Sequence, residues 1–272
     1  MTKSSGLDQH QREKAGVLTS PKPSVIYEVI RSEGEHELSR PFSALWWSGV
    51  AAGLAISTSV MCKGFLVAVL PPDAAWAPAV SSFGYAVGFL IVILGRMQLF
   101  TENTITPVLS LFLAPRREGF VRTARLWGIV FAANMVGCAV AAALFAYGRI
   151  VPPAQLAGIM KVATDYAEIT ALEHLVWGMP AGFLVASLVW VLPRLQGAGE
   201  VMAIVIVTYM IGLGGLSHVV AGSTGLFLAV MAGALGPVDA LLTGTLPSLV
   251  GNVVGGTFMF AALTYAQLRE EL

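Results

Sequence analysis

The sequence predicts an all-α integral membrane protein with six transmembrane helices, of which the second and fifth are broken. Of the 272 residues, 56% are hydrophobic and only 12% are charged, whereas soluble domains carry about 25% charged residues. Six apolar blocks can each supply the roughly 20 residues of helix that cross a bilayer, and they lack the alternation of a membrane barrel. The blocks cover residues 44–70, 78–113, 122–147, 171–192, 200–232 and 236–266.

The segment before the first block, residues 1–43, is predicted to be a cytoplasmic tail with an amphipathic helix. Residues 1–22 are polar and contain no apolar signal-peptide core, so we expect disorder there. Residues 23–40 place apolar side chains at helical spacing, which favours a helix lying under the membrane domain. That domain is expected over residues 44–268, in a bacterial-type inner membrane with the lipid bilayer as its partner.

Basic residues are concentrated on one side of the expected topology. If the blocks alternate in direction, twelve of the 16 Lys and Arg residues share the side of both termini, and only Arg149 and Lys161 lie opposite. The positive-inside rule then places both termini in the cytoplasm. This topology signal accounts for the basic loop, and we expect no nucleic-acid partner. The twelve are Lys3, Arg12, Lys14, Lys22, Arg31, Arg40, Arg116, Arg117, Arg122, Arg125, Arg194 and Arg269.

Two short polar or glycine-rich breaks, residues 95–104 and 215–224, interrupt the second and fifth blocks. Paired breaks in two halves of a membrane chain indicate a solute site at membrane depth. The second half-helices are expected to begin near Thr104, as a possible cap, and at Gly222. Helix N-termini carry partial positive charge, which suits a passing anion or water.

The two halves of the chain resemble each other. Asn134 in the third block matches Asn252 in the sixth, and the segment at 51–54 resembles that at 180–183. The repeats are placed at about 44–147 and 171–266, with three spans each. An odd number of spans inverts the second repeat relative to the first, with a pseudo-two-fold axis in the membrane plane.

His218, in the second break, is the sharpest candidate for a pore residue. It can donate a hydrogen bond to a solute or change its charge, although a lone buried histidine is also often a satisfied core residue. Thr101 is expected to face it with a hydroxyl. Leu99 and Phe100 can close a pore by dewetting, with simple packing as the alternative.

Polar residues around the breaks are expected to support the broken backbone. Glu102 and Asn103 follow the first break, and a structural pair between Arg96 and Glu102 would explain a carboxylate there. Asn134 and Asn252 are expected to bond backbone groups rather than solute. Apart from His218, no acid, base, nucleophile or metal-ligand cluster lies at membrane depth, so we expect no enzyme, no cofactor and no metal.

These motifs resemble the formate/nitrite transporter family. The chain has Leu99, Phe100 and Thr101 in the second block, His218 in the fifth, and a Gly-Asn-x-x-Gly-Gly stretch at 251–256. The resemblance covers about residues 40–268. It implies a homopentamer of aquaporin-like protomers, each with its own pore, passing small monocarboxylates, nitrite or hydrosulfide.

Several positions depart from the family pattern. Ser217 stands where a glutamate usually precedes the histidine, Gly222 replaces an asparagine, and Gln98 replaces an acidic residue. An aromatic of the fifth-span constriction corresponds to Ile211. The outer-mouth lysine of the family has no clear counterpart: Tyr166 or Glu168 lies near its position, with Lys161 a few residues upstream, and an acidic residue there, Asp165 or Glu168, would weaken the preference for anions.

Three functions follow from these observations. The leading one is a channel or proton-coupled carrier for a small monovalent ion such as formate or nitrite, or for its neutral acid. The alternative is the same scaffold conducting small cations or neutral solutes, favoured by Ser217, Ile211 and the acidic loop 165–173. The third, a membrane sensor without transport, lacks an output domain. Residues 23–40, with His36 between Glu35 and Glu37, could also gate the pore in response to acid.

Overall fold

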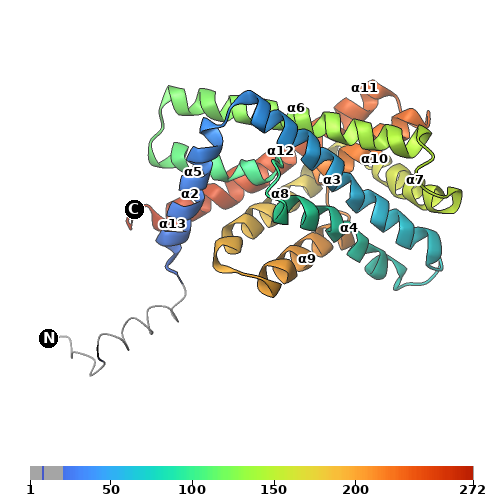
Figure 1. The fold of residues 1–272 in the computed structure, drawn as a ribbon, viewed down its shortest axis with the longest axis horizontal. Helices are drawn as coiled ribbons and strands as arrows, with labels where there is room; N and C mark the ends of the chain where they lie inside the picture. The colour runs from blue at the N-terminus through green and yellow to red at the C-terminus, as the bar shows by residue number, and fades with distance from the viewer. Residues whose placement is uncertain (1–7, 9–20, 272) are drawn as a thin grey trace.

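The computed structural model describes Asp8 and residues 21–271, and its regular elements over this range are all helices (Figure 1). Five helical segments are long and apolar enough to cross a membrane, and two shorter apolar helices follow the fourth of them along the chain. The helices are α2 Pro23–Ser39, α3 Phe42–Val69, α4 Ala77–Leu94, α5 Thr106–Leu113, α6 Arg117–Tyr147, α7 Pro153–Ala167, α8 Ala171–Val191, α9 Ala198–Leu213, α10 Val219–Met231, α11 Pro237–Asp239, α12 Leu246–Val253 and α13 Ala262–Leu268.

The first predicted break separates α4 from α5. α4 ends at Leu94, a single 3₁₀ turn covers Glu102–Thr104 (η1), and α5 begins at Thr106. Pro107 lies in the first turn of α5, where its missing N–H leaves no helical hydrogen bond unmade. The expected Thr104 cap is absent, because its hydroxyl donates instead to the Thr101 carbonyl at 2.8 Å.

The second predicted break separates α9 from α10. α9 ends at Leu213, and α10 begins at Val219 rather than at Gly222. The predicted start was wrong by about one turn, because the His218 side chain accepts the Ala221 N–H at 3.2 Å and caps the helix earlier.

The predicted amphipathic helix forms as α2 and packs firmly onto α5. Its buried face includes Tyr27, whose hydroxyl donates to the Leu109 carbonyl at 2.7 Å. Burial raises the pKa of Tyr27 to about 12, so the phenol keeps the proton that it donates. Gly34 lies directly against the Thr106 carbonyl, and a Cβ there would collide with it. α2 is thus part of the folded body.

No helix is predicted between the third and fourth blocks, yet α7 fills that interval. Gly158 of α7 packs on the Gly64 carbonyl of α3, and Ala163 lies in van der Waals contact with Gly225 of α10. α7 therefore covers the half-helix of the second break, much as α2 covers the half-helix of the first.

The last apolar block, Pro237–Leu268, contains two π-helical stretches, η3 Ala240–Thr245 and η4 Val254–Ala261. Gly255 lies against the Met179 carbonyl of α8, where a side chain would not fit. The hydroxyl of Thr257 donates to the Thr104 carbonyl at 2.6 Å. This block therefore packs closely on both α8 and the first break.

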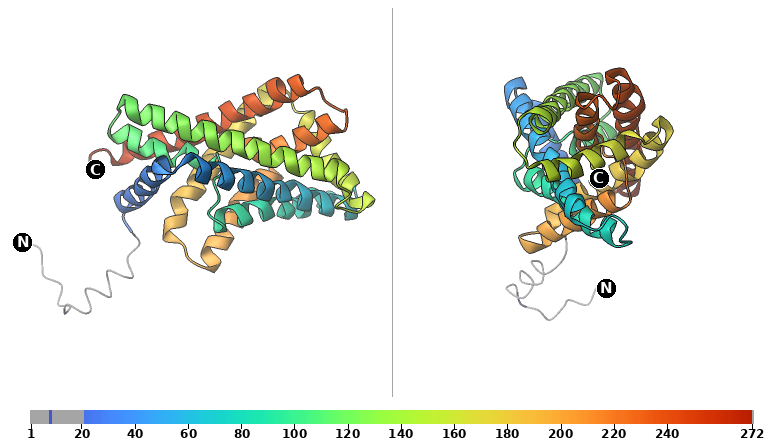
Figure 2. Two further views of the ribbon diagram at one scale, coloured as in Figure 1. Left: turned by 45° about the horizontal axis from the view of Figure 1, so that its top comes forward. Right: turned by 90° about the vertical axis from the view of Figure 1, so that its right-hand side faces the viewer.

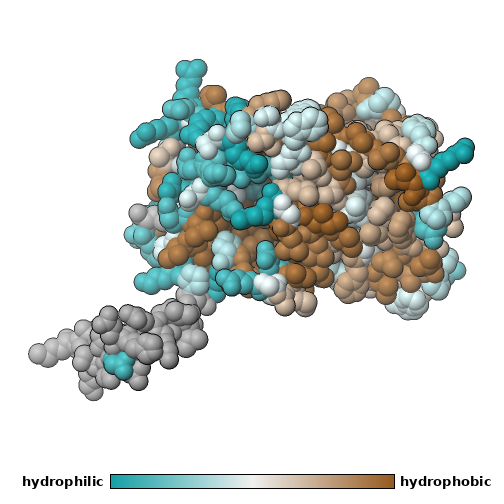
Figure 3. All heavy atoms as spheres, in the orientation of Figure 1, coloured by the Kyte–Doolittle hydropathy of each residue, from teal (hydrophilic) through white to brown (hydrophobic). Residues whose placement is uncertain are grey.

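α6 runs along the long axis of the molecule for nearly its full length, whereas α2 is steeply inclined to that axis (Figure 1 and Figure 2). α2 and α13 lie at the same end, where the rings of Tyr27 and Tyr265 are 6.5 Å apart. Hydrophobic residues cover the middle of the face shown in Figure 3, and hydrophilic residues gather most densely at the α2 end. This distribution fits a body inserted in a bilayer.

Candidate functional site

The two breaks meet at the centre of the molecule through Thr101 and His218. Thr101 Oγ1 lies 2.8 Å from His218 Nε2, and both residues are completely buried. The ring of Phe89, from α4, meets the imidazole edge-on with centroids 4.9 Å apart. The hydroxyl and the imidazole that the sequence predicts to face each other are therefore brought into direct contact.

The hydrogen bonds of His218 fix its tautomer. Nδ1 accepts the backbone N–H of Ala221, so in the neutral ring the proton lies on Nε2. Nε2–H then donates to Thr101 Oγ1, which leaves the threonine hydroxyl proton free for another acceptor. The site therefore offers one donor, the Thr101 hydroxyl proton, while the imidazole N–H is engaged by the threonine oxygen.

Asn134 and Asn252 hold the two breaks with the same set of hydrogen bonds. Asn134 Oδ1 accepts the Phe100 N–H at 2.9 Å, and its amide donates to the carbonyls of Gln98 and Gly49. Asn252 Oδ1 accepts the Val219 N–H at 2.9 Å, and its amide donates to the carbonyls of Ser217 and Gly178. Each asparagine thus satisfies one N–H and one carbonyl of its break and ties the break to a neighbouring helix through the second carbonyl, Gly49 of α3 or Gly178 of α8.

Leu99 and Phe100 are buried at the first break. Phe100 packs edge-on against Trp127 and Phe131 of α6, with centroids 5.8 Å and 5.2 Å apart. Leu99 lies in the same core cluster as Phe89 and Val219. Apolar side chains therefore surround the bridge between Thr101 and His218.

A chain of amides connects this break to α2. The Gln98 amide donates to Glu37 Oε2 at 2.7 Å and accepts from Asn103 Nδ2 at 3.1 Å. Glu37 also accepts from Arg40 at 3.0 Å. The Trp127 indole N–H donates to the backbone carbonyl of Asn103 at 2.8 Å.

Arg96 does not pair with Glu102. It forms an exposed ion pair with Glu33 of α2, with 2.6 Å between Nη2 and Oε1. Glu102 Oε1 is buried and has no hydrogen-bond partner among the residues that the structure describes. Arg96 therefore joins the break to α2 instead of neutralising the neighbouring carboxylate.

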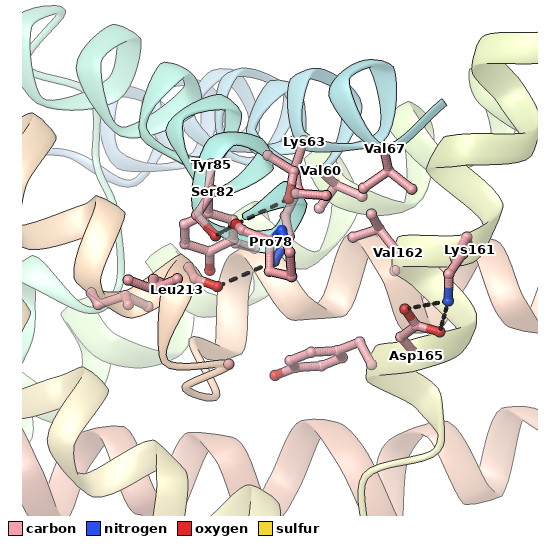
Figure 4. A pocket seen from close by; sticks show the side chains of 18 of the residues that line it. Val60, Lys63, Val67, Pro78, Ser82, Tyr85, Lys161, Val162, Asp165 and Leu213 are labelled. Carbon is pink, nitrogen blue, oxygen red and sulfur yellow. Dashed lines mark hydrogen bonds and ion pairs between the residues drawn. The ribbon is translucent and has the colours of Figure 1, made fainter. Parts of the chain in front are cut away.

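A cavity of about 490 Å³ lies beside α7, which supplies part of its lining (Figure 4). Its rim includes residues 70–72, which follow α3, and it extends inward to Ile211, Leu216 and the α10 residues Ala221 and Gly222. Since the Ala221 N–H bonds His218, the inner wall of the cavity lies directly beside the central site.

Three charged side chains line this cavity. Lys161 and Asp165, four residues apart on α7, pair with each other at 3.0 Å. Lys63, from α3, donates to the Gly212 carbonyl at 3.2 Å, and its Nζ lies 6.0 Å from the centre of the Tyr85 ring. Glu168, which the sequence places near the entrance, is exposed at the end of α7 and lies outside the cavity lining.

Tyr166 and Gly222 are in intimate contact. A Cβ on Gly222 would overlap the Tyr166 ring, so the missing side chain makes room for the phenol. The Tyr166 hydroxyl lies 3.3 Å from Ser248 Oγ, and burial raises the pKa of Tyr166 to about 12, which keeps it uncharged. The two departures from the family pattern therefore compensate for each other sterically.

Ser217 has a partner that sequence reasoning missed. His174 Nδ1 lies 2.9 Å from Ser217 Oγ and 3.2 Å from Ser248 Oγ, and its ring contacts that of Tyr166. His174 is as completely buried as His218. His174 lies near the start of the fourth apolar block, where a polar residue is ordinary, so the sequence gives no sign of its role. Lys63 was missed for a similar reason, because it stands in the first block as a single charge with no motif around it.

Comparisons with known proteins place the chain among membrane transporters. A family model described as Formate/nitrite transporter matches residues 24–266. The chain is 37% identical over 247 residues to Inner membrane protein YfdC from Escherichia coli K12, covering 91% of this chain and 79% of that one. It is 26% identical over 250 residues to Uncharacterized transporter YrhG from Bacillus subtilis, covering 90% and 92%.

Solved structures share the fold at low sequence identity. One described as FNT family ion channel has a TM-score of 0.77 and 20% identity, covering 89% of this chain and 99% of that one. Another, described as Pentameric formate channel with formate bound, has a TM-score of 0.70 and 18% identity, covering 84% and 98%.

Proposed function

We propose that this chain, which belongs to the formate/nitrite transporter family, passes a small monovalent anion such as formate or nitrite, or its neutral acid, through a pore in each protomer. The observation that supports this most directly is the contact between Thr101 and His218, which joins the two breaks beside the inner wall of a cavity. The family is one of transporters rather than enzymes, in agreement with the expectation from sequence.

The surroundings of the contact between Thr101 and His218 favour passage of a neutral species. Leu99, Phe100 and Phe89 surround the site with apolar groups, where a bare charge is costly. His218 Nε2–H donates to Thr101 Oγ1, and the threonine hydroxyl proton that this leaves free offers a hydrogen bond that a carboxylic acid or nitrous acid can accept. The anion is therefore attracted in the cavity and crosses the centre after gaining a proton.

An inverted repeat of three plus three spans is supported by the paired asparagines. Asn134 and Asn252 lie 118 positions apart, and Phe100 and Val219, whose N–H groups they accept, lie 119 apart. In this arrangement α4 with α5 forms the second crossing and α9 with α10 forms the fifth, so the chain crosses the membrane six times.

We also propose a homopentamer in an inner membrane with both termini in the cytoplasm. The solved structure described as a pentameric formate channel shares the fold, and the relative from Escherichia coli is described as an inner membrane protein. α2 and α13 lie at one end of the body. In the expected topology, most Lys and Arg residues of the sequence are on the membrane side to which that end belongs.

The alternative function keeps the same scaffold but admits small cations or neutral solutes. Asp165 in the cavity lining and the exposed Glu168 favour it, because carboxylates at an entrance attract cations. The ion pair of Asp165 with Lys161 weakens this attraction.

The reversal potential of the purified protein in planar bilayers under a potassium formate gradient separates the two. A reversal near the formate equilibrium potential supports the proposal, and one near the potassium potential overturns it in favour of the alternative. His218→Ala is expected to abolish most of the formate current. His36→Ala is the comparison variant at constant neutral pH: His36 is an exposed histidine on α2 whose predicted role is a response to acid only, so the current at neutral pH should be unchanged.

A further inference from the structure

Lys63 is an unusual residue for its position. It lies in α3, a segment apolar enough to cross a membrane, about 9 Å along the helix from Val69 at 1.5 Å per residue. A charge at such a depth is costly unless it is paired or serves a function. Among the residues that the structure describes, no carboxylate lies within ion-pair distance of Lys63, and Asp165 acts on it only at longer range.

The charges of the cavity leave Lys63 uncompensated. Of the charged side chains in the lining, Lys161 and Asp165 neutralise each other, with both carboxylate oxygens 3.0 Å from the ammonium. The remaining lining residues are apolar or uncharged. The cavity therefore carries one net positive charge, located on Lys63 Nζ.

The contacts of Lys63 leave room for a ligand. One N–H donates to the Gly212 carbonyl at 3.2 Å, which holds the ammonium in place, and an ammonium has three donors. The Tyr85 ring stands beside it, and Figure 4 shows Lys63 and Tyr85 together in the cavity, apart from the pair of Lys161 and Asp165. The volume of about 490 Å³ is ample for a small ion with several waters.

We propose that Lys63 Nζ forms an anion-binding site within this cavity, which takes a small monovalent oxyanion or carboxylate before it reaches His218. The site selects ions by sign, because Lys63 attracts anions and repels cations within the cavity that reaches the α10 wall. This inference rests on the proposed function, since it assigns the residue that draws the permeant anion in. A charge-assisted hydrogen bond in a partly dry cavity is strong enough to do so.

Binding of formate to the full-length purified protein in detergent tests the site without requiring transport. The probe is sodium formate, followed by broadening of its single proton NMR resonance across a titration. Lys63→Met keeps the length of the side chain and removes the charge, and we expect about a tenfold higher half-saturating concentration. Lys63→Arg should stay within about threefold of the unmodified protein. Arg149→Gln removes one positive charge outside the cavity lining and should change nothing.

Three results would overturn the proposal: unchanged binding in Lys63→Met, equal loss in Arg149→Gln, or no saturable broadening by the unmodified protein. If Lys63→Met does not fold, Lys63→Gln replaces it in the same titration. Planar bilayer currents separate this inference from the proposed function. Binding that depends on Lys63 in a protein without formate current would refute only the transport function, whereas formate current without that dependence would refute only the site.

Discussion

The two breaks are held in the same way but are filled with different chemistry. Each is clamped by one asparagine that accepts one N–H and donates to two carbonyls. The first break then runs from 95 to 105 and supplies Leu99, Phe100 and the Thr101 hydroxyl, whereas the second runs from 214 to 218 and supplies His218. The two halves of the chain therefore share the way in which an asparagine holds the backbone of the break. They differ in the side chain that each break contributes to the site, Thr101 in one and His218 in the other.

The helices that cover the two breaks extend the comparison. α2 packs on α5 through Gly34 and Thr106, and α7 packs on α10 through Ala163 and Gly225. Corresponding residues of the two pairs are separated by nearly constant distances in the sequence: Gly34 and Ala163 are 129 positions apart, and Thr106 and Gly225 are 119 apart. α2 and α7 thus occupy corresponding places, which would start each repeat one helix earlier than the sequence predicts.

The largest effect is expected from removing the asparagine clamps. Asn252→Ala leaves the Val219 N–H and the Ser217 carbonyl of the break without this partner and removes a further bond to the Gly178 carbonyl, so we expect a loss of about 3–5 kcal/mol in the free energy of unfolding. Asn134→Ala removes the same number of bonds but should cost less, because α2 also supports the first break through Gln98. Thermal unfolding in detergent measures both. Equal destabilisation would show that α2 adds no support.

The next effect concerns the cover of the second break. Gly222→Ala drives a methyl group into the Tyr166 ring, and we expect a cost of about 1–3 kcal/mol from overpacking. The loss should largely disappear in a Tyr166→Ala background, because the obstacle is a side chain. Double-mutant unfolding data give the coupling energy, and additive losses would rule out the steric account.

The bridge between the breaks is expected to control flux more than stability. Thr101→Val keeps the shape and removes the hydroxyl that accepts from His218 Nε2. Formate uptake into proteoliposomes should fall about tenfold, which is the worth of one hydrogen bond of about 1.4 kcal/mol. Thr101→Ser retains the hydroxyl and serves as the control. Full activity of Thr101→Val would mean that the hydroxyl only fills space.

Much of this site could be predicted from sequence because membrane depth makes polar residues conspicuous. His218, Thr101, Asn134 and Asn252 all stand out against apolar blocks, and the structure brings each of them to a break. α7 could not be predicted, since its short amphipathic stretch lies between two stronger blocks.

Lys63 and His174 show where sequence reasoning ends. Their roles depend on which side chains three other helices place beside them. Lys63 donates to the Gly212 carbonyl of α9, and His174 contacts Ser217 and Ser248, which come from distant parts of the chain. No local pattern in the sequence encodes these encounters.

The smallest effect on stability is expected at the contact between α2 and the first break, where gating by residues 23–40 remains a prediction. Arg96→Gln breaks an exposed ion pair with Glu33, and such pairs contribute about 0–1 kcal/mol. Glu37→Gln removes the charge that Gln98 and Arg40 contact, again with little effect on unfolding.

Flux is the sharper readout for this contact. If α2 gates the pore, Glu37→Gln changes the pH dependence of formate flux, while Glu28→Gln, which breaks a pair within α2 to Arg31, does not. Deleting residues 1–40 is a poorer test, because it would also expose the apolar surface that Tyr27 covers. An unchanged pH profile in Glu37→Gln would leave α2 as a structural cover, equivalent to α7 in the other half.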